Sequence, residues 1–168
     1  PPYPSRGRGG RMHPVDFDDV RAAAARIEGI VAHTPVLTSI ALDTLAGRRL
    51  FFKCENLQHV GAFKFRGASN AVALLGSEAR IGVCTHSSGN HAQALALAAK
   101  QHGIPAYIVM PDNAPQVKVE GVRSHGAEIT FCEPTLAARE STAAAVIAGS
   151  DTHLTLPTVC SVYILVDA

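Results

Sequence analysis

The sequence has little excess charge, few cysteines and no long apolar run. Its 15 Lys and Arg residues face 14 Asp and Glu, and this balance argues against a nucleic-acid partner held through phosphate neutralisation. No apolar stretch approaches the ~20 residues of a membrane-spanning helix, so we expect no membrane partner and a cytoplasmic protein. The cysteines are widely spaced, and the histidines do not supply a cluster of ligands at short spacing with any of them, which argues against a metal site. We expect them to be reduced thiols of the core, at Cys54, Cys84, Cys132 and Cys160.

Both ends of the chain differ in composition from its middle. Residues 1–14 are rich in proline, glycine and arginine, which predicts a disordered extension. An organellar presequence is the alternative, although the segment shows no helical amphipathicity. Residues 151–168 form a divergent C-terminal tail, in which 159–166 could make one more strand. The whole chain has 168 residues, nearly half of them apolar, and this length and composition suit one globular unit.

From residue 81 onward, strand-like and helix-like segments alternate. Regular alternation of this kind predicts a parallel sheet with helices packed on it. We expect strands at 81–84, 106–110 and 127–132, and helices near 90–102, 115–124 and 135–148. Residues 81–150 are therefore expected to form a small βα domain.

The front half of the chain predicts helices more than strands. Asp16 can cap a helix over 17–27, where apolar residues recur at intervals of three and four. A short helix over 39–45 and a strand over 49–53 follow. The next helix begins near Lys64.

Lys64 is set between two phenylalanines in the segment Gly61–Ala68. Burial of a lysine in apolar surroundings favours its neutral amine, the nucleophile that forms an imine with a carbonyl group. Such chemistry is typical of pyridoxal phosphate. The alternative is a lysine whose stem lies on an apolar surface while its charge stays in water.

A polar turn follows the first expected strand of the βα region. It runs from Thr85 to His91 and leads into an alanine-rich helix. Ligands of open parallel sheets bind where the carboxyl ends of strands meet the starts of helices. The hydroxyl, amide and backbone N–H groups of this turn are thus candidates for ligand binding.

In three segments the sequence resembles the fold-type II pyridoxal phosphate enzymes, specifically the branch of serine/threonine dehydratases and serine racemases. The segments are Phe51–Gln58, Gly61–Ala68 and Thr85–Ala94. The resemblance runs from about Val15 to about Ala148 and implies an α/β fold like that of the tryptophan synthase β-subunit. Residues 15–80 would then be the N-terminal part of the large domain, with the Lys64 helix. The family's glycine-rich phosphate loop has no counterpart here.

The resemblance also implies roles for individual residues. Lys64 would bind pyridoxal 5'-phosphate and act as the base, and Ser88 would be the second acid/base in racemisation. Asn90 would bond the ring hydroxyl of the cofactor, and Phe63 would form a wall against the ring. Alternatives are that Ser88 or Asn90 only caps the next helix and that Phe63 only packs in the core. The turn as a whole would bind substrate through Ser87, Ser88, Gly89, Asn90 and His91.

Effector and metal sites are less well matched. The racemase branch binds a nucleotide near positions resembled here by Thr38, Ser39 and Gln93. The family's divalent-cation carboxylates have no counterpart within this chain, so Mg²⁺ and ATP effectors are expected only of the full-length family. Ala62 stands where many relatives have a hydroxyl residue, which should not prevent attachment of the cofactor.

The implied activity is that of a serine racemase or serine/threonine dehydratase. Serine or threonine would lose its β-hydroxyl to give a keto acid and ammonia, and serine could also be racemised. We expect a truncated form of such an enzyme and, as in much of the family, a homodimer. One alternative is an inactive isoform or an interaction partner of full-length subunits, and another is a cysteine-synthase-like β-replacement enzyme.

Overall fold

The computed structural model describes residues 15–149, and a three-stranded parallel sheet lies at the centre of its larger part. The strands occur in the order β3-β4-β5, with β3 and β4 in register at Val83 and Ala106. Their bounds are β3 Val83–His86, β4 Ala106–Pro111 and β5 Glu128–Cys132. The predicted parallel sheet is confirmed.

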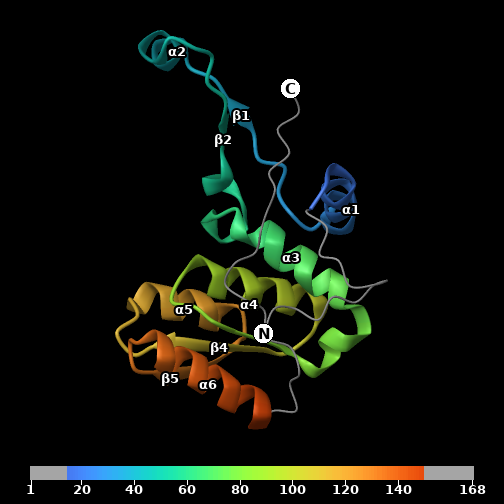
Figure 1. Ribbon diagram of the computed structural model, residues 1–168, viewed down its shortest axis with the longest axis vertical. Coiled ribbons are helices and arrows are strands. Elements are labelled where there is room, and N and C mark those ends of the chain that lie inside the picture. Colours follow the sequence, from blue (N-terminus) through green and yellow to red (C-terminus); the bar gives the residue numbers. More distant parts are fainter. Residues whose placement is uncertain (1–14, 150–168) are drawn as a thin grey trace.

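Helices cover both faces of this sheet (Figure 1). Their bounds are α3 Lys64–Leu75, α4 Asn90–His102, α5 Gln116–Ser124 and α6 Leu136–Gly149. Helices α4 and α5 pack on one face, α6 packs on the other, and α3 lies on the outer side of α4. The predicted βα unit, residues 81–150, lies within the described residues except for its last position. The predictions for residues 1–14, for the tail 151–168 and for a strand at 159–166 concern residues outside the described ones.

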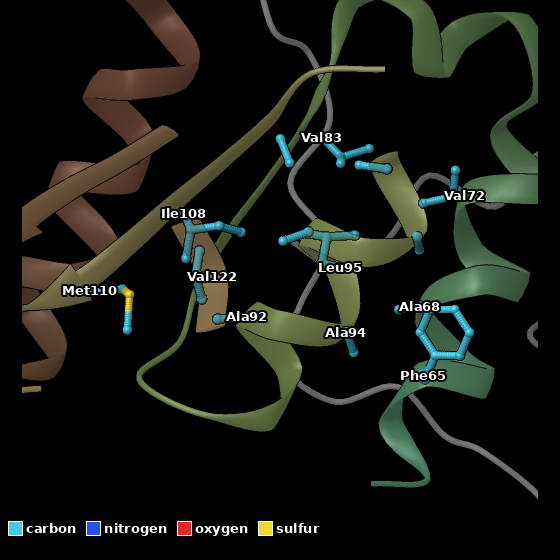
Figure 2. Close-up of a cluster of buried hydrophobic side chains, with 14 of the residues drawn as sticks. Phe65, Ala68, Val72, Val83, Ala92, Ala94, Leu95, Ile108, Met110 and Val122 are labelled. Atoms are coloured by element: carbon cyan, nitrogen blue, oxygen red, sulfur yellow. The ribbon is translucent and has the colours of Figure 1, made fainter. Parts of the chain in front are cut away.

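Successive side chains of each strand point to opposite faces of the sheet, so each face has its own apolar cluster. Val83 and Ile108 join the cluster with α3, α4 and α5, whereas Cys84 and Val109 pack with Ala143 of α6. Figure 2 shows the first cluster, in which α4 is enclosed between the sheet and α3. Helix α4 contributes mainly alanines to these contacts, and their small side chains allow the neighbouring backbones to come close.

The strand expected at 81–84 begins two residues later than predicted. Ile81 ends a 3-10 turn (η3, Gly76–Ile81), and Gly82 has a φ of +107°. A Cβ atom at Gly82 would lie 2.9 Å from Cε2 of Tyr107, so the turn requires glycine both for its backbone angle and for its space. The apolar character of Ile81 suggested a strand, but the glycine delays its start.

The front of the chain forms α1 and an arm that projects from the body (Figure 1). Helix α1, Phe17–Ile27, begins with the predicted cap, since Asp16 and Asp19 form a capping box. The arm consists of β1 (Val36–Leu37), α2 (Ile40–Ala46) and β2 (Phe52–Lys53), with β1 antiparallel to β2. Two 3-10 turns, η1 Glu55–Leu57 and η2 His59–Gly61, lead from the arm to α3. Within residues 15–149 no helix is long and apolar enough to cross a membrane.

Candidate active site

Lys64 is the first residue of α3, and its neighbours in sequence point in different directions. Phe65 is fully buried in the apolar cluster, whereas Phe63 is 39% exposed. Lys64 itself is half-buried. The exposure of Phe63 contradicts the alternative that this side chain only packs in the core. Only one of the two phenylalanines therefore anchors the helix, and the other is free to contact a ligand.

The backbone before Lys64 is strained. Val60 has a φ of 56°, in the left-handed region, and Gly61 follows with a φ of 66°. A β-branched residue rarely adopts this conformation, and residues that do are often found near functional sites. The sharp turn brings η2 directly to the start of α3.

A buried polar cluster fixes the first turn of α3. Arg66 donates to both carboxylate oxygens of Glu55, at 2.9 and 2.8 Å, and to Oγ1 of Thr34 at 3.2 Å. Thr34 also donates to Glu55 at 2.5 Å. Burial acts to raise the pKa of Glu55, but its bonds with Arg66 and Thr34 outweigh burial and lower that pKa. Arg66 thus ties α3 to segments before and after the arm.

Gln58 and Lys53 extend this cluster. The Gln58 side chain accepts from the backbone N–H of Ala32 at 2.9 Å and donates to its carbonyl at 2.8 Å. Lys53 donates to the carbonyl of Thr34 at 2.6 Å. Sequence reasoning missed these roles. The signal was a glutamate, a glutamine and an arginine placed among apolar residues in the segments that carried the resemblance.

The serine turn lies at the carboxyl end of β3, as expected. The N–H of Ser87 donates to the carbonyl of Val109 at 3.0 Å, so the strand pairing continues into the turn. Gly89 is the N-cap of α4, and no side chain caps this end. The cap alternative for Ser88 and Asn90 is therefore wrong. Both side chains are half-buried and remain available for other contacts.

His91 connects the turn to Lys64. Its ring is 1% exposed, and neither ring nitrogen has a hydrogen-bond partner within residues 15–149. Burial, followed by the charges of Lys64 and His86, lowers the pKa of His91 to about 4. The imidazole is therefore neutral near pH 7, and Lys64 lies within electrostatic reach of it. The packing of α3 on α4 creates this neighbourhood.

Asn90 is held by a residue that sequence reasoning did not select. Nζ of Lys118, on α5, donates to Oδ1 of Asn90 at 2.9 Å. One turn further along both helices, Gly121 faces Gln93, where an added Cβ would lie 2.8 Å from Cδ of Gln93. The close approach of α4 and α5 thus determines what Asn90 contacts.

The three residues predicted for a nucleotide effector are not brought together. Thr38 and Ser39 lie in the arm, where Ser39 caps α2. Gln93 lies on α4 in the body, well separated from α2 (Figure 1). The nucleotide site stays a prediction. Among residues 15–149 there is also no group of three or more His, Cys, Asp or Glu side chains that could hold a metal ion.

Three of the four cysteines lie within the described residues, and all three are free thiols. Cys84 is buried in β3, and burial raises the pKa of its thiol to about 11, which leaves it protonated and unreactive. Cys54 and Cys132 are half-buried. Cys160 falls outside the described residues.

The residues gathered here fit the ring end of pyridoxal phosphate. Lys64 supplies an amine, Asn90 an amide, and His91 a buried polar ring whose nitrogens have no protein partner in the described part of the chain. The first N–H groups of α4 have no partner within the helix and suit an anionic group. This set could bind an aldehyde cofactor and the carboxylate of an amino acid.

The chain is similar to known pyridoxal-phosphate dependent enzymes. A family model for pyridoxal-phosphate dependent enzymes matches residues 27–165. The chain is 52% identical over 142 residues to a serine racemase of Oryza sativa, covering 83% of this chain and 42% of the relative. It is 51% identical over 136 residues to a β-hydroxyaspartate dehydratase of Paracoccus denitrificans, covering 80% and 43%.

A solved structure has the same fold over the part of it that this chain covers. Maize serine racemase superimposes with a TM-score of 0.81 at 46% identity, over 85% of this chain and 44% of the maize chain. The chain thus spans less than half the length of the relatives that it matches. On its sequence and its fold, it belongs to the fold-type II family of pyridoxal-phosphate dependent enzymes.

Proposed function

We propose that this chain carries the lysine and serine-turn part of an enzyme that acts on serine or threonine. The reaction is β-elimination to a keto acid and ammonia, accompanied by racemisation of serine. The observation that supports it most directly is that α3, which begins at Lys64, packs against α4, which begins at Asn90 of the serine turn. The names of the relatives, a serine racemase and a hydroxyaspartate dehydratase, support the same reaction class.

The residues of the chain would divide the work as follows. Lys64 holds the cofactor and, when its amine is free, removes the proton from Cα of the substrate. The N–H groups at the start of α4 bind the substrate carboxylate. Pyridoxal phosphate, when bound, withdraws electrons from Cα. His91, neutral near pH 7, adds no positive charge beside Lys64.

Ser88 is proposed as the acid/base on the opposite face of the substrate. It is half-buried, caps no helix, and belongs to the same turn as Asn90. Replacement by alanine should abolish conversion of L-serine to D-serine while pyruvate formation from L-serine continues. Chiral chromatography and a pyruvate assay on the same reaction mixture measure the two products. Equal loss of both products would assign Ser88 to substrate binding instead.

Attachment of the cofactor is the first test. The purified chain is mixed with pyridoxal phosphate and reduced with borohydride, and the modified peptide is identified by mass spectrometry. We expect the modification at Lys64 and its loss in Lys64→Ala, because a covalent bond to the cofactor requires an amine in the site. Lys100→Ala, which removes an exposed lysine of α4, is the matched control and should leave the modification unchanged. Modification spread over many lysines, or unaffected by Lys64→Ala, would reject the proposal.

A second function is favoured by a specific observation, the exposed apolar surface of the arm. The arm would let the chain associate with longer subunits of the same family without catalysing a reaction itself. Sedimentation of the chain alone and mixed with a full-length serine racemase would show whether it forms homodimers or mixed assemblies. The exposed apolar side chains of the arm are Val36, Leu37, Ile40, Leu42, Leu45, Phe51 and Phe52.

A further inference from the structure

The contact between Lys118 and Asn90 joins α5 to the start of α4. Nζ of Lys118 lies 2.9 Å from Oδ1 of Asn90, and both side chains are half-buried. The pair is reinforced one turn further on, where Gly121 allows Gln93 to lie directly against α5. Helix α5 is therefore held at a fixed distance from the first residue of α4.

The chemistry of the two groups determines the orientation of the amide. A lysine ammonium has three donors and no acceptor, whereas an asparagine amide has one acceptor oxygen and one donor nitrogen. Lys118 can therefore bond only to Oδ1 of Asn90, as observed. An Asn90 amide held in this way leaves its Nδ2 hydrogens for a different partner. Without Lys118 the amide could rotate by 180° and present its oxygen there instead.

We propose that Lys118 is a positioning residue that makes Asn90 a hydrogen-bond donor to the cofactor. This inference rests on the proposed function, since it concerns the same site. The ring oxygen of pyridoxal phosphate is a hydrogen-bond acceptor when ionised, and a donating Nδ2 group stabilises that form. The ammonium of Lys118, which lies behind Asn90 as seen from the cofactor, adds a positive charge that also favours the ionised ring oxygen. Lys118 thus acts on the cofactor through Asn90 and touches no reacting atom.

The test uses binding and spectroscopy of the whole chain. Pyridoxal phosphate is titrated into the wild type and into Lys118→Met, which keeps an unbranched stem but has neither donor nor charge. We expect a dissociation constant about tenfold higher, as for the loss of one hydrogen bond. We also expect the pH at which the visible spectrum of the bound cofactor changes to move upward, because the ionised ring oxygen has lost its support. Lys118→Arg, which keeps the donor, should restore part of both properties.

A double-variant cycle separates positioning from a direct effect. If Lys118 acts through Asn90, Lys118→Met should change neither property in an Asn90→Ala background. An undiminished effect in that background would overturn the inference, and so would a single variant that behaves like the wild type. Circular dichroism checks folding, and Lys118→Leu, which also lacks a donor and a charge, takes the place of Lys118→Met should that variant fail to fold.

Failure of the proposed function gives a different result. In that case the wild type itself does not attach the cofactor at Lys64, whatever stands at position 118. Attachment at Lys118 in place of Lys64 would reject both proposals, since Lys118 would then be a reacting group. Attachment at Lys64 with no effect of Lys118 would reject only the present inference.

Discussion

The two halves of the site are held by different physical interactions. The serine turn stands on the β3–β4–β5 unit, where the strands and α4 form a closed apolar core. Lys64 is the first residue of α3, beside the arm and its exposed apolar side chains. Phe65 anchors this helix in the apolar core, and the polar cluster of Glu55, Arg66, Thr34 and Gln58 ties it to the segments on either side of the arm. The two meet only because α3 packs against α4.

This difference teaches which perturbations each half can tolerate. An apolar core loses stability roughly in proportion to the volume removed when a buried side chain is truncated. A buried polar cluster depends on every partner, because removal of one leaves another charge or dipole unsatisfied. The position of Lys64 should therefore be more sensitive to single polar changes than the serine turn is.

The largest effect is expected from breaking the polar cluster. Glu55→Gln leaves the buried guanidinium of Arg66 without its opposite charge, and loss of one partner of a buried ion pair costs about 3 to 5 kcal/mol. The free energy of unfolding, measured in urea, should fall by that amount. Glu140→Gln, at an exposed position of α6, is the matched control and should change it by less than about 0.5 kcal/mol.

A paired replacement sharpens this result. Glu55→Leu combined with Arg66→Met removes both charges, and such replacements of buried pairs by apolar residues are often close to neutral. We expect the double variant to be more stable than Glu55→Gln. If the double variant is the less stable of the two, the cluster is held by its neutral hydrogen bonds rather than by its charges.

The same leucine-to-alanine change should differ between the two regions. Leu95 of α4 is 0% exposed, and its replacement should cost about 2 to 5 kcal/mol through the cavity that remains. Leu45 of α2 is 88% exposed, and its replacement should stay within about 0.5 kcal/mol. Urea unfolding at several protein concentrations measures both. A loss at Leu45 that grows with concentration would show that the arm is covered by a second copy in solution.

The smallest effect at neutral pH is expected from His91, and it should appear only on acidification. Its folded pKa of about 4 lies below the ordinary value of 6.5, so between these values the unfolded chain binds a proton that the folded chain does not. Stability should therefore decrease as pH falls through this window, by on the order of 3 kcal/mol at its lower end. Thermal unfolding of the wild type and of His91→Leu between pH 7 and pH 4 measures this difference.

The control for this prediction is a histidine on the same helix. His102→Leu replaces an exposed ring at the end of α4 and should keep the acid sensitivity of the wild type. Glu55 also contributes to acid sensitivity, since its lowered pKa means that stability is lost when it takes up a proton. The contribution of His91 is therefore the change in slope between wild type and His91→Leu. An unchanged slope would mean that His91 gains a partner in solution.

Much of the fold could be predicted because its signals are local. The alternation of apolar strands with helical segments after residue 81, the Asp16 cap and the turn before α4 each depend on residues within one element or its neighbour. The start of β3 was placed two residues early because Gly82 requires a backbone turn that apolar character does not reveal. The resemblance predicts that Lys64 and the serine turn share one site, and the packing of α3 on α4 supports this prediction.

The sequence alone determined which chemical groups the candidate site offers: an amine at position 64, hydroxyls at 87 and 88, an amide at 90 and an imidazole at 91. Tertiary structure alone decided which groups meet. Arg66 reaches the carbonyl of Ala32 across 34 positions, and Lys118 reaches Asn90 across 28. Contacts over such separations depend on how α3, α4 and α5 pack, and packing is a property of the assembled core that no single segment encodes.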